Sequence, residues 1–182
     1  MSFYTRKGDD GTTGLFYGGR VRKDAGAPEA YGEVDEAQAF IGAARALVRG
    51  SELDTLLLDV ERDLYVLMAE LATLPENRSK LTPGTSSVTA EMVERIEGVT
   101  DGLVARFEMP KEFVLPGEDV VSAALDVART VVRRAERRAV GIASDGSHVV
   151  PYLNRLSSLL WAAARWQEGE AVPAKPAKRK DP

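Results

Sequence analysis

Helical periodicity over most of the chain is the feature that most constrains how this sequence can fold. Five segments repeat apolar residues at spacings of three and four, as in the one that places Met92, Ile96 and Val99 on one stripe. Such spacing buries one face of a helix. The expected helices run over about residues 30–48, 52–74, 89–107, 120–142 and 152–168. Strand-like alternation is essentially absent and the connections are short or moderate, so we predict an all-α fold, a five-helix antiparallel bundle.

The length of 182 residues is enough for one domain with a substantial core. We expect this domain to cover residues 1–169. Residues 170–182 are rich in proline and lysine and poor in large apolar side chains, a composition that predicts a disordered basic tail. The tail could touch phosphates or acidic partners, but a solvated tail is the favoured interpretation.

Composition excludes several classes of function. The formal net charge of −4 disfavours a nucleic-acid-binding protein. No apolar run approaches the roughly 20 residues of a membrane span, and the start of the chain lacks the apolar stretch of a signal peptide. The absence of cysteine excludes thiolate metal sites, and the single histidine, His148, excludes a multi-histidine centre. We therefore expect a cytoplasmic protein without a metal site of its own and without a nucleic-acid or membrane partner.

A glycine-rich segment near the start, TRKGDDGTTG at residues 5–14, has almost nothing apolar to bury. We therefore exclude a core helix or a half-buried strand here. The segment is typical of a loop whose backbone N–H groups bind a polyphosphate, with charge added by Arg6 and Lys7. It contains neither a Walker A motif nor a Gly-x-Gly-x-x-Gly sequence after a strand. A mobile N-terminal arm is the alternative.

The expected fourth helix carries two different stripes. Its apolar stripe is dominated by alanine: Ala124, Ala128, Val131, Ala135 and Ala139. These small residues allow a neighbouring helix to approach closely. A second stripe carries Arg129, Arg133 and Glu136, with Arg137 beside it. Two guanidinium groups next to a carboxylate suit a phosphate chain and a sugar hydroxyl, whereas the alternative is a solvated, salt-bridged face.

Three other polar residues are candidates for binding or assembly. Asn154 lies beside the apolar stripe of the fifth helix, where an amide binds a ligand or satisfies backbone groups. Asp35 could reach an arginine on another helix or another subunit, although acids in a first turn usually only compensate the helix dipole. Lys23 could place a charge on a phosphate, and the alternative is an exposed lysine. We interpret His148, in the loop before the fifth helix, as incidental rather than catalytic.

Six motifs in order, TRKGDDGTTG, GGRVRKD, EAYGEVDE, FVLPG, ARTVVRRAER and YLNRLS, resemble the PduO-type ATP:cob(I)alamin adenosyltransferases. The resemblance runs from Thr5 to about Arg165. It implies a ferritin-like bundle assembled as a homotrimer, with active sites between adjacent subunits. The implied reaction transfers the 5′-deoxyadenosyl group of ATP to the cobalt of cob(I)alamin or a related corrinoid, which releases triphosphate and forms adenosylcobalamin.

The resemblance also implies a set of site residues, carried over motif by motif. In the N-terminal segment the ATP-binding residues are Thr5, Arg6, Lys7, Gly8, Thr13, Gly14 and Lys23. In the helices they are Arg133, Arg134, Glu136, Arg137 and Asn154. Asp35 and Arg129 match a pair that links subunits near the site, and Phe113 matches an aromatic residue at the lower face of the corrin. The expected catalytic residues are thus Arg133, Asp35, Arg129 and Phe113.

The implied chemistry explains why these residue types are present. Cobalt in the +1 state is itself the nucleophile that attacks C5′ of ATP, so the protein has to position the substrates and stabilise the leaving triphosphate. Arginines, a lysine, backbone N–H groups and Mg²⁺ suit that task. The family removes the lower axial ligand of Co(II) to make it reducible, and Phe113 would fill the vacated space. A flavoprotein reductase and an adenosylcobalamin-dependent acceptor enzyme are the expected partners.

The chain departs from the pattern of the family at four positions. Glu118 follows an LPG where LPGG is common, and Gln38, Ala27 and Asp126 stand where asparagine, arginine and histidine are common. These departures lie outside the main ATP-binding motifs, so they affect the expected corrinoid binding and subunit interface more than the expected ATP binding. The main alternative function is a nucleotide- or corrinoid-binding regulator or carrier on the same scaffold. A nucleic-acid-binding helical bundle is a third possibility, which the acidic balance disfavours.

Overall fold

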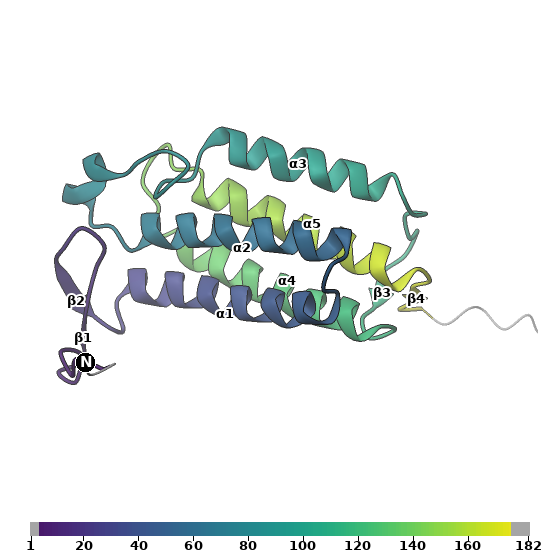
Figure 1. Ribbon diagram of the computed structural model, residues 1–182, viewed down its shortest axis with the longest axis horizontal. Coiled ribbons are helices and arrows are strands. Elements are labelled where there is room, and N and C mark those ends of the chain that lie inside the picture. The colour runs from purple at the N-terminus through teal and green to yellow at the C-terminus, as the bar shows by residue number, and fades with distance from the viewer. Residues whose placement is uncertain (1–3, 176–182) are drawn as a thin grey trace, which may run out of the picture.

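A computed structural model describes residues 4–175, so most of the expected tail lies outside the described residues. Five α-helices lie side by side along the long axis of the molecule (Figure 1). They are α1 (Gly26–Leu47), α2 (Glu52–Leu71), α3 (Ala90–Val104), α4 (Val120–Ala139) and α5 (Val149–Glu168), and a 3-10 helix, η1 (Pro75–Lys80), follows α2. The mostly helical prediction is confirmed. None of the helices within residues 4–175 combines the length and the apolar composition that crossing a membrane requires.

The ends of the helices follow from local capping. The side chains of Ser51, Thr89 and Asp119 accept hydrogen bonds from backbone N–H groups in the first turns of α2, α3 and α4. These caps satisfy donors that the helix itself cannot pair. In contrast, α5 begins three residues before its predicted start at Tyr152. The reason is Pro151, which fits within a first helical turn because its missing N–H has no partner to lose there.

Helix α4 occupies the middle of the fold, since it packs extensively on both α1 and α5. Its predicted alanine-rich stripe is the packed face, and Ala128, Ala135 and Ala139 are fully buried. Helix α2 packs on α1, and α3 packs mainly on α5. This arrangement leaves the predicted arginine stripe of α4 at the edges of the α4–α5 contact rather than inside it.

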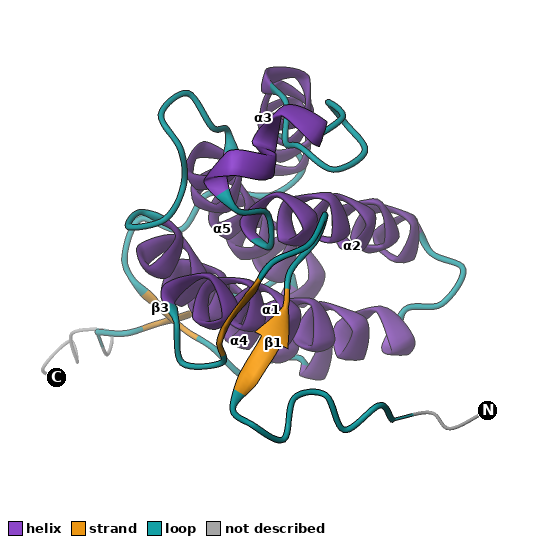
Figure 2. Ribbon diagram, turned by 90° about the vertical axis from the view of Figure 1, so that its left-hand side faces the viewer, coloured by secondary structure: helices purple, strands orange, loops and turns teal. Residues whose placement is uncertain are grey.

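Two short ribbons correct the prediction that strands are absent. β1 (Thr12–Gly14) pairs antiparallel with β2 (Arg20–Arg22), and Figure 2 shows β1 outside the helices. Thr12 and Thr13 are half-buried, so the exclusion of a half-buried strand from the glycine-rich segment was wrong there. Val21 is the one apolar residue of the two strands, so the pairing rests mainly on the ladder, which satisfies the backbone itself.

The second ribbon joins the loop before α4 to the segment after α5. β3 (Val114–Leu115) pairs antiparallel with β4 (Val172–Pro173), and the N–H of Ala174 donates to the carbonyl of Phe113 at 2.6 Å. Val172 and Pro173 fall within the segment predicted to be disordered. The backbone of Phe113 is therefore held by residues far away in the sequence.

A buried polar contact ties α2, α3 and α5 together. The hydroxyl of Tyr152, which is fully buried, donates to Oδ2 of Asp63 at 2.7 Å. The guanidinium of Arg95 donates to the same oxygen. Burial and the neighbouring Asp63 charge raise the pKa of Tyr152 well above its usual value. Tyr152 therefore remains a neutral donor, and it supports a buried carboxylate that would otherwise lack a donor on its α5 side.

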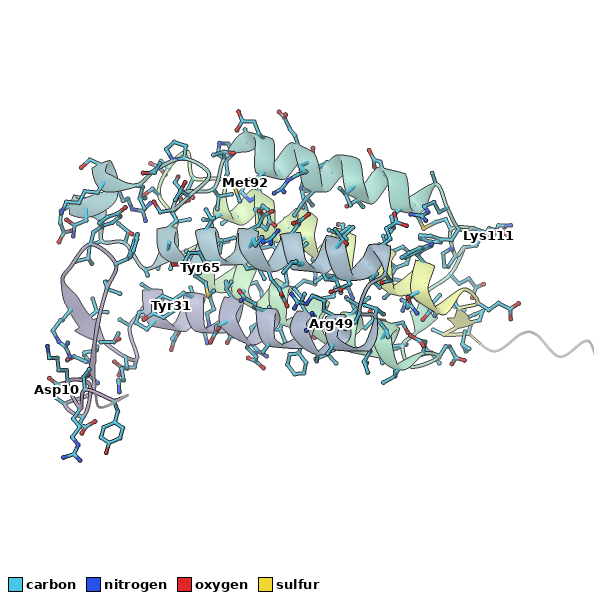
Figure 3. All side chains as sticks on the ribbon, viewed as in Figure 1. Asp10, Tyr31, Arg49, Tyr65, Met92 and Lys111 are labelled. Carbon is cyan, nitrogen blue, oxygen red and sulfur yellow. The ribbon has the colours of Figure 1, made fainter. Side chains whose placement is uncertain are left out.

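We expect Tyr152→Phe to lower the free energy of unfolding by about 1–3 kcal/mol, because it removes one donor from a buried carboxylate. The measurement is urea unfolding followed by circular dichroism. Tyr65→Phe is the matched control, since Tyr65 on α2 is 67% exposed and points away from the core (Figure 3). The control should change stability by less than about 0.5 kcal/mol. Equal losses in the two variants would contradict a role for the Tyr152 hydrogen bond.

Candidate functional site

Arg20 on β2 organises the N-terminal loop. One of its terminal nitrogens donates to the carbonyl of Lys7 and to the hydroxyl of Thr12, both at 2.6 Å. The Thr12 hydroxyl in turn donates to Oδ1 of Asp10 at 2.7 Å. The hydrogen bonds from Thr12, helped by the Arg20 charge, lower the pKa of Asp10. The loop thus has a defined internal structure, which argues against the alternative of a mobile arm.

Lys23 lies against this loop. Its backbone N–H donates to the carbonyl of Gly11 at 2.9 Å. A Cβ at Gly8 would stand 3.2 Å from Nζ of Lys23 and 3.1 Å from the carbonyl oxygen of Thr12. Glycine at position 8 therefore lets the Lys23 ammonium approach the backbone closely. Of the other expected ATP-binding residues in this segment, three are exposed in the loop and two lie on β1: Thr5, Arg6 and Lys7, and Thr13 and Gly14.

The tip of the β1–β2 hairpin fixes the position of the loop on the helices. The N–H of Phe16 donates to the carbonyl of Ala72, at the end of α2, at 2.9 Å. Gly19 has a φ of 88° and lies so close to the side chain of Leu74 that a Cβ would collide with it. The positive φ therefore favours glycine at position 19, and a Cβ there would also force the end of the Leu74 side chain to move.

The predicted stripe on α4 is partly organised by α5. The amide nitrogen of Asn154 donates to Oε1 of Glu136 at 2.9 Å, and the amide oxygen accepts from Arg155 at 2.6 Å. Arg137 donates to the carbonyl of Arg133 at 2.9 Å, and both of these side chains are exposed. The structure therefore brings Glu136 and Asn154 into contact and leaves two guanidinium groups beside them available for an anion.

Arg134 differs from the other arginines of this stripe because it faces α1. Its guanidinium donates to Glu33 and Glu36, two carboxylates on successive turns of α1. These hydrogen bonds raise the pKa of Arg134. The arginine links α4 to α1, so binding of ATP by Arg134 stays a prediction that competes with two ion pairs within the chain.

Two cavities lie on the other side of α4. The first, of about 400 Å³, is lined by α3, α4 and α5 and includes Arg129 and Arg133; we call it the Arg133 cavity. The second, of about 500 Å³, includes Phe113, Arg129 and Arg165; we call it the Phe113 cavity. Arg129 and Trp161 line both. Phe113 itself is 90% exposed, so its ring is free to cover a flat ligand at the opening.

The predicted residues form separate groups within one chain. Asp10 in the N-terminal loop and Lys111 in the loop before β3 lie at opposite ends of the long axis (Figure 3). Neither cavity is lined by any residue of segment 4–25. Asp35 is exposed on α1 and makes no ion pair or hydrogen bond through its side chain to another part of the described chain. Arg129 does not contact Asp35 but donates from Nε to Asp126 at 2.9 Å.

Sequence reasoning missed two groups. Arg20 was not singled out, although its strand lies opposite the threonines of β1. The buried pair of Asp126 and Arg165, at 2.6 Å, was also missed. Arg165 follows an unbroken apolar run at residues 159–164, and an arginine placed there signals that a buried acid must lie nearby, on the same helix or on a neighbouring one.

Comparisons with known proteins found relatives that match most of the chain. The family model for cobalamin adenosyltransferase matches residues 3–167. The corrinoid adenosyltransferase of Mycobacterium tuberculosis is 44% identical over 168 residues, which are 89% of this chain and 86% of that protein. Corrinoid adenosyltransferase PduO of Salmonella typhimurium is 37% identical over 177 residues; the match covers 96% of this chain but only 52% of that relative.

Solved structures extend the similarity to three dimensions. One is a PduO-type ATP:corrinoid adenosyltransferase from Lactobacillus reuteri, a variant with alanine in place of a phenylalanine, in complex with cobalamin and ATP. It matches with a TM-score of 0.85 at 26% identity, over 96% of this chain and 100% of that chain. A histidine variant of the same enzyme, also with cobalamin and ATP, matches with a TM-score of 0.81 at 29% identity, over 92% and 91% of the two chains.

We expect Arg20→Ala to loosen the N-terminal loop without unfolding the helices, because the Arg20 guanidinium holds both Lys7 and Thr12. Hydrogen exchange of a peptide covering residues 5–12 should become at least about tenfold faster, as local opening requires less free energy. Arg22→Ala is the matched control: Arg22 is on the same strand but pairs only with Asp24, at the surface. Unchanged protection in Arg20→Ala would show that the loop does not depend on Arg20.

Proposed function

Because the chain belongs to the cobalamin adenosyltransferase family, we propose that it is a corrinoid adenosyltransferase. It transfers the 5′-deoxyadenosyl group of ATP to the cobalt of cob(I)alamin or a related corrinoid and releases triphosphate. The observation that carries the proposal is the α4 stripe, where Glu136 is fixed by Asn154 beside the exposed Arg133 and Arg137. A carboxylate held beside two exposed guanidinium groups suits a nucleotide better than a purely structural role.

The residues have separate tasks in this reaction. The reduced cobalt of the substrate attacks C5′, so no side chain has to act as a base. Negative charge accumulates on the departing triphosphate, and fixed cations stabilise it most effectively when they are already in place. Arg133, Arg137, Lys7 and Lys23 supply that charge, and Glu136 accepts a hydrogen bond from a sugar hydroxyl.

Phe113 and the magnesium ion complete the proposed site. The exposed ring of Phe113 lies against the lower face of the corrin and keeps an axial ligand away from cobalt, which favours reduction of Co(II). Mg²⁺ enters with ATP as part of the substrate. Residues 4–175 hold no cluster of three or more acidic or histidine side chains arranged for a metal ion, so the phosphates themselves would carry most of its coordination.

The proposed active unit is a homotrimer of ferritin-like five-helix bundles with sites between subunits. The N-terminal loop contributes nothing to the cavities of its own chain, so a neighbouring loop would complete each site. In this assembly Asp35 of the partner subunit pairs with Arg129. A flavoprotein reductase would supply the electrons in the cytoplasm, and an enzyme that uses adenosylcobalamin would accept the product.

We expect the purified protein, mixed with MgATP and chemically reduced cob(I)alamin, to give the absorbance change of cobalt–carbon bond formation. Arg133→Ala and Lys23→Ala should each raise the KM for ATP by about tenfold or more, since each loses a charge-assisted contact. Arg138→Ala is the control, because Arg138 pairs with Glu29 at 3.2 Å on another side of α4. A wild-type protein that forms no such bond would disprove the activity, and equal effects at all three positions would argue against a placed phosphate site.

Mixed trimers test the sharing of sites. If one subunit supplies Lys23 and the next supplies Arg133, random mixing of Lys23→Ala and Arg133→Ala subunits restores an intact pair at about one site in four. We expect coexpressed, purified mixed trimers to recover that fraction of wild-type activity at low ATP. Each variant expressed alone is the control. Mixed trimers no more active than the two separate variants would contradict a site built from two subunits.

A further inference from the structure

A buried carboxylate joins α4 to α5 at the wall of the Phe113 cavity. The side chain of Asp126 is 7% exposed, and its two oxygens have different partners. Oδ2 accepts from Arg165 at 2.6 Å, and Oδ1 accepts from Nε of Arg129 at 2.9 Å. Asp126 therefore links the buried Arg165 to the partly exposed Arg129, and both arginines line the Phe113 cavity.

The inner arginine holds the carboxylate in place. The side chain of Arg165 is 2% exposed, and that of Glu168 is fully buried with its Oε1 2.6 Å from Nε of Arg165. The Arg165 guanidinium also lies 5.6 Å from the centre of the Trp161 ring. A guanidinium without counter-charges at this depth would be strongly unfavourable. Asp126 thus cannot turn away without leaving a buried cation short of a partner.

The guanidinium of Arg129, the more exposed of the two arginines, is held by the described residues only through its Nε–H group. The side chain of Arg129 is 28% exposed, and its single hydrogen bond to residues 4–175 is the one from Nε to Asp126. Because the guanidinium is planar, fixing Nε also fixes the plane and the direction of the two terminal nitrogens. Those nitrogens belong to a side chain that lines both the Arg133 cavity and the Phe113 cavity.

We propose that Asp126 is a positioning residue, which holds Arg129 as an oriented positive charge at the junction of the two cavities. This inference rests on the proposed function, in which Arg133 binds the triphosphate and Phe113 lies against the corrin, since Arg129 lines the cavity of each. Arg129 contacts the shared site directly, and Asp126 acts through it. The buried Arg165 and Glu168 keep Asp126 from moving, so the orientation of Arg129 is set before any substrate binds.

Asp126→Asn tests the proposal, since it keeps the shape of the side chain and removes the charge that binds two arginines. We expect kcat/KM for adenosylation to fall at least about tenfold. Arg129→Ala should show a similar loss, and the double variant should be no less active than Arg129→Ala alone, because in this proposal Asp126 affects activity only through Arg129. Asp126→Glu keeps the charge and should retain more activity than Asp126→Asn.

Asp63→Asn is a matched control. Asp63 is also a buried carboxylate that accepts from an arginine and from a buried donor, Arg95 and Tyr152, but it lines a different cavity between α2 and α3. Both asparagine variants should lower the melting temperature. When both variants are assayed well below their melting temperatures, only Asp126→Asn should lower kcat/KM. The comparison thus separates a loss of stability from a loss of the orientation of Arg129.

A second measurement does not depend on activity. The Nε–H of Arg129 should give a slowly exchanging proton–nitrogen NMR signal in the wild-type protein, and Asp126→Asn should abolish that protection. Wild-type kcat/KM in Asp126→Asn, additive losses in the double variant, or an unprotected Arg129 signal in the wild type would each overturn the proposal. If the Nε–H proton of Arg129 exchanges slowly in the wild-type protein but no cobalt–carbon bond forms, the proposed function is disproved. The positioning of Arg129 by Asp126 would still be supported.

Discussion

The close packing of α4 against both α1 and α5 is the constraint on which the rest of the structure depends. Alanine at 128, 135 and 139 lets the neighbouring helices approach until these positions are fully buried. A helix held from two sides cannot rotate, so the polar residues at the edges of the packed stripe have fixed directions. On the α1 side Arg134 meets two carboxylates, and on the α5 side Glu136 meets Asn154. Each of these polar contacts contributes little by itself, but together they form an ordered surface because the helix that carries them is held in place.

The helical part of the fold could be predicted because spacing, caps and breakers are local. The starts expected at about residues 52, 89 and 120 agree with the structure to within one residue, and each of these helices is capped by the side chain of Ser51, Thr89 or Asp119. The ribbons could not be predicted in the same way, since pairing depends on partners distant in sequence or on docking. β1 is stabilised by β2 and by the attachment of Phe16 to the end of α2. Neither contact can be predicted from the composition of the segment alone.

The candidate site was predictable in its residue types but not in its internal contacts. The arginine stripe and the loop cations were apparent from residue chemistry, whereas the pairing of Asp35 with Arg129 and the role of Phe113 came only from the family resemblance. The contact between Glu136 and Asn154 required knowing how α4 and α5 meet. Asp126 was noticed only as a departure from the pattern of the family. Its partner Arg165 lies far along the chain on another helix, and one sequence contains no information about that distance.

The pairing of β3 with β4 sets an order of events during folding. The segment that carries Phe113 precedes α4, but the strand that fastens it follows α5. Closing so long a loop is entropically more costly than closing the β1–β2 hairpin, and it becomes favourable only when α4 and α5 already lie against each other. On a ribosome, the Phe113 segment therefore emerges early and waits unfastened while two helices are synthesised. The part of the chain proposed to meet the corrin therefore cannot be fastened until the segment after α5 has been synthesised.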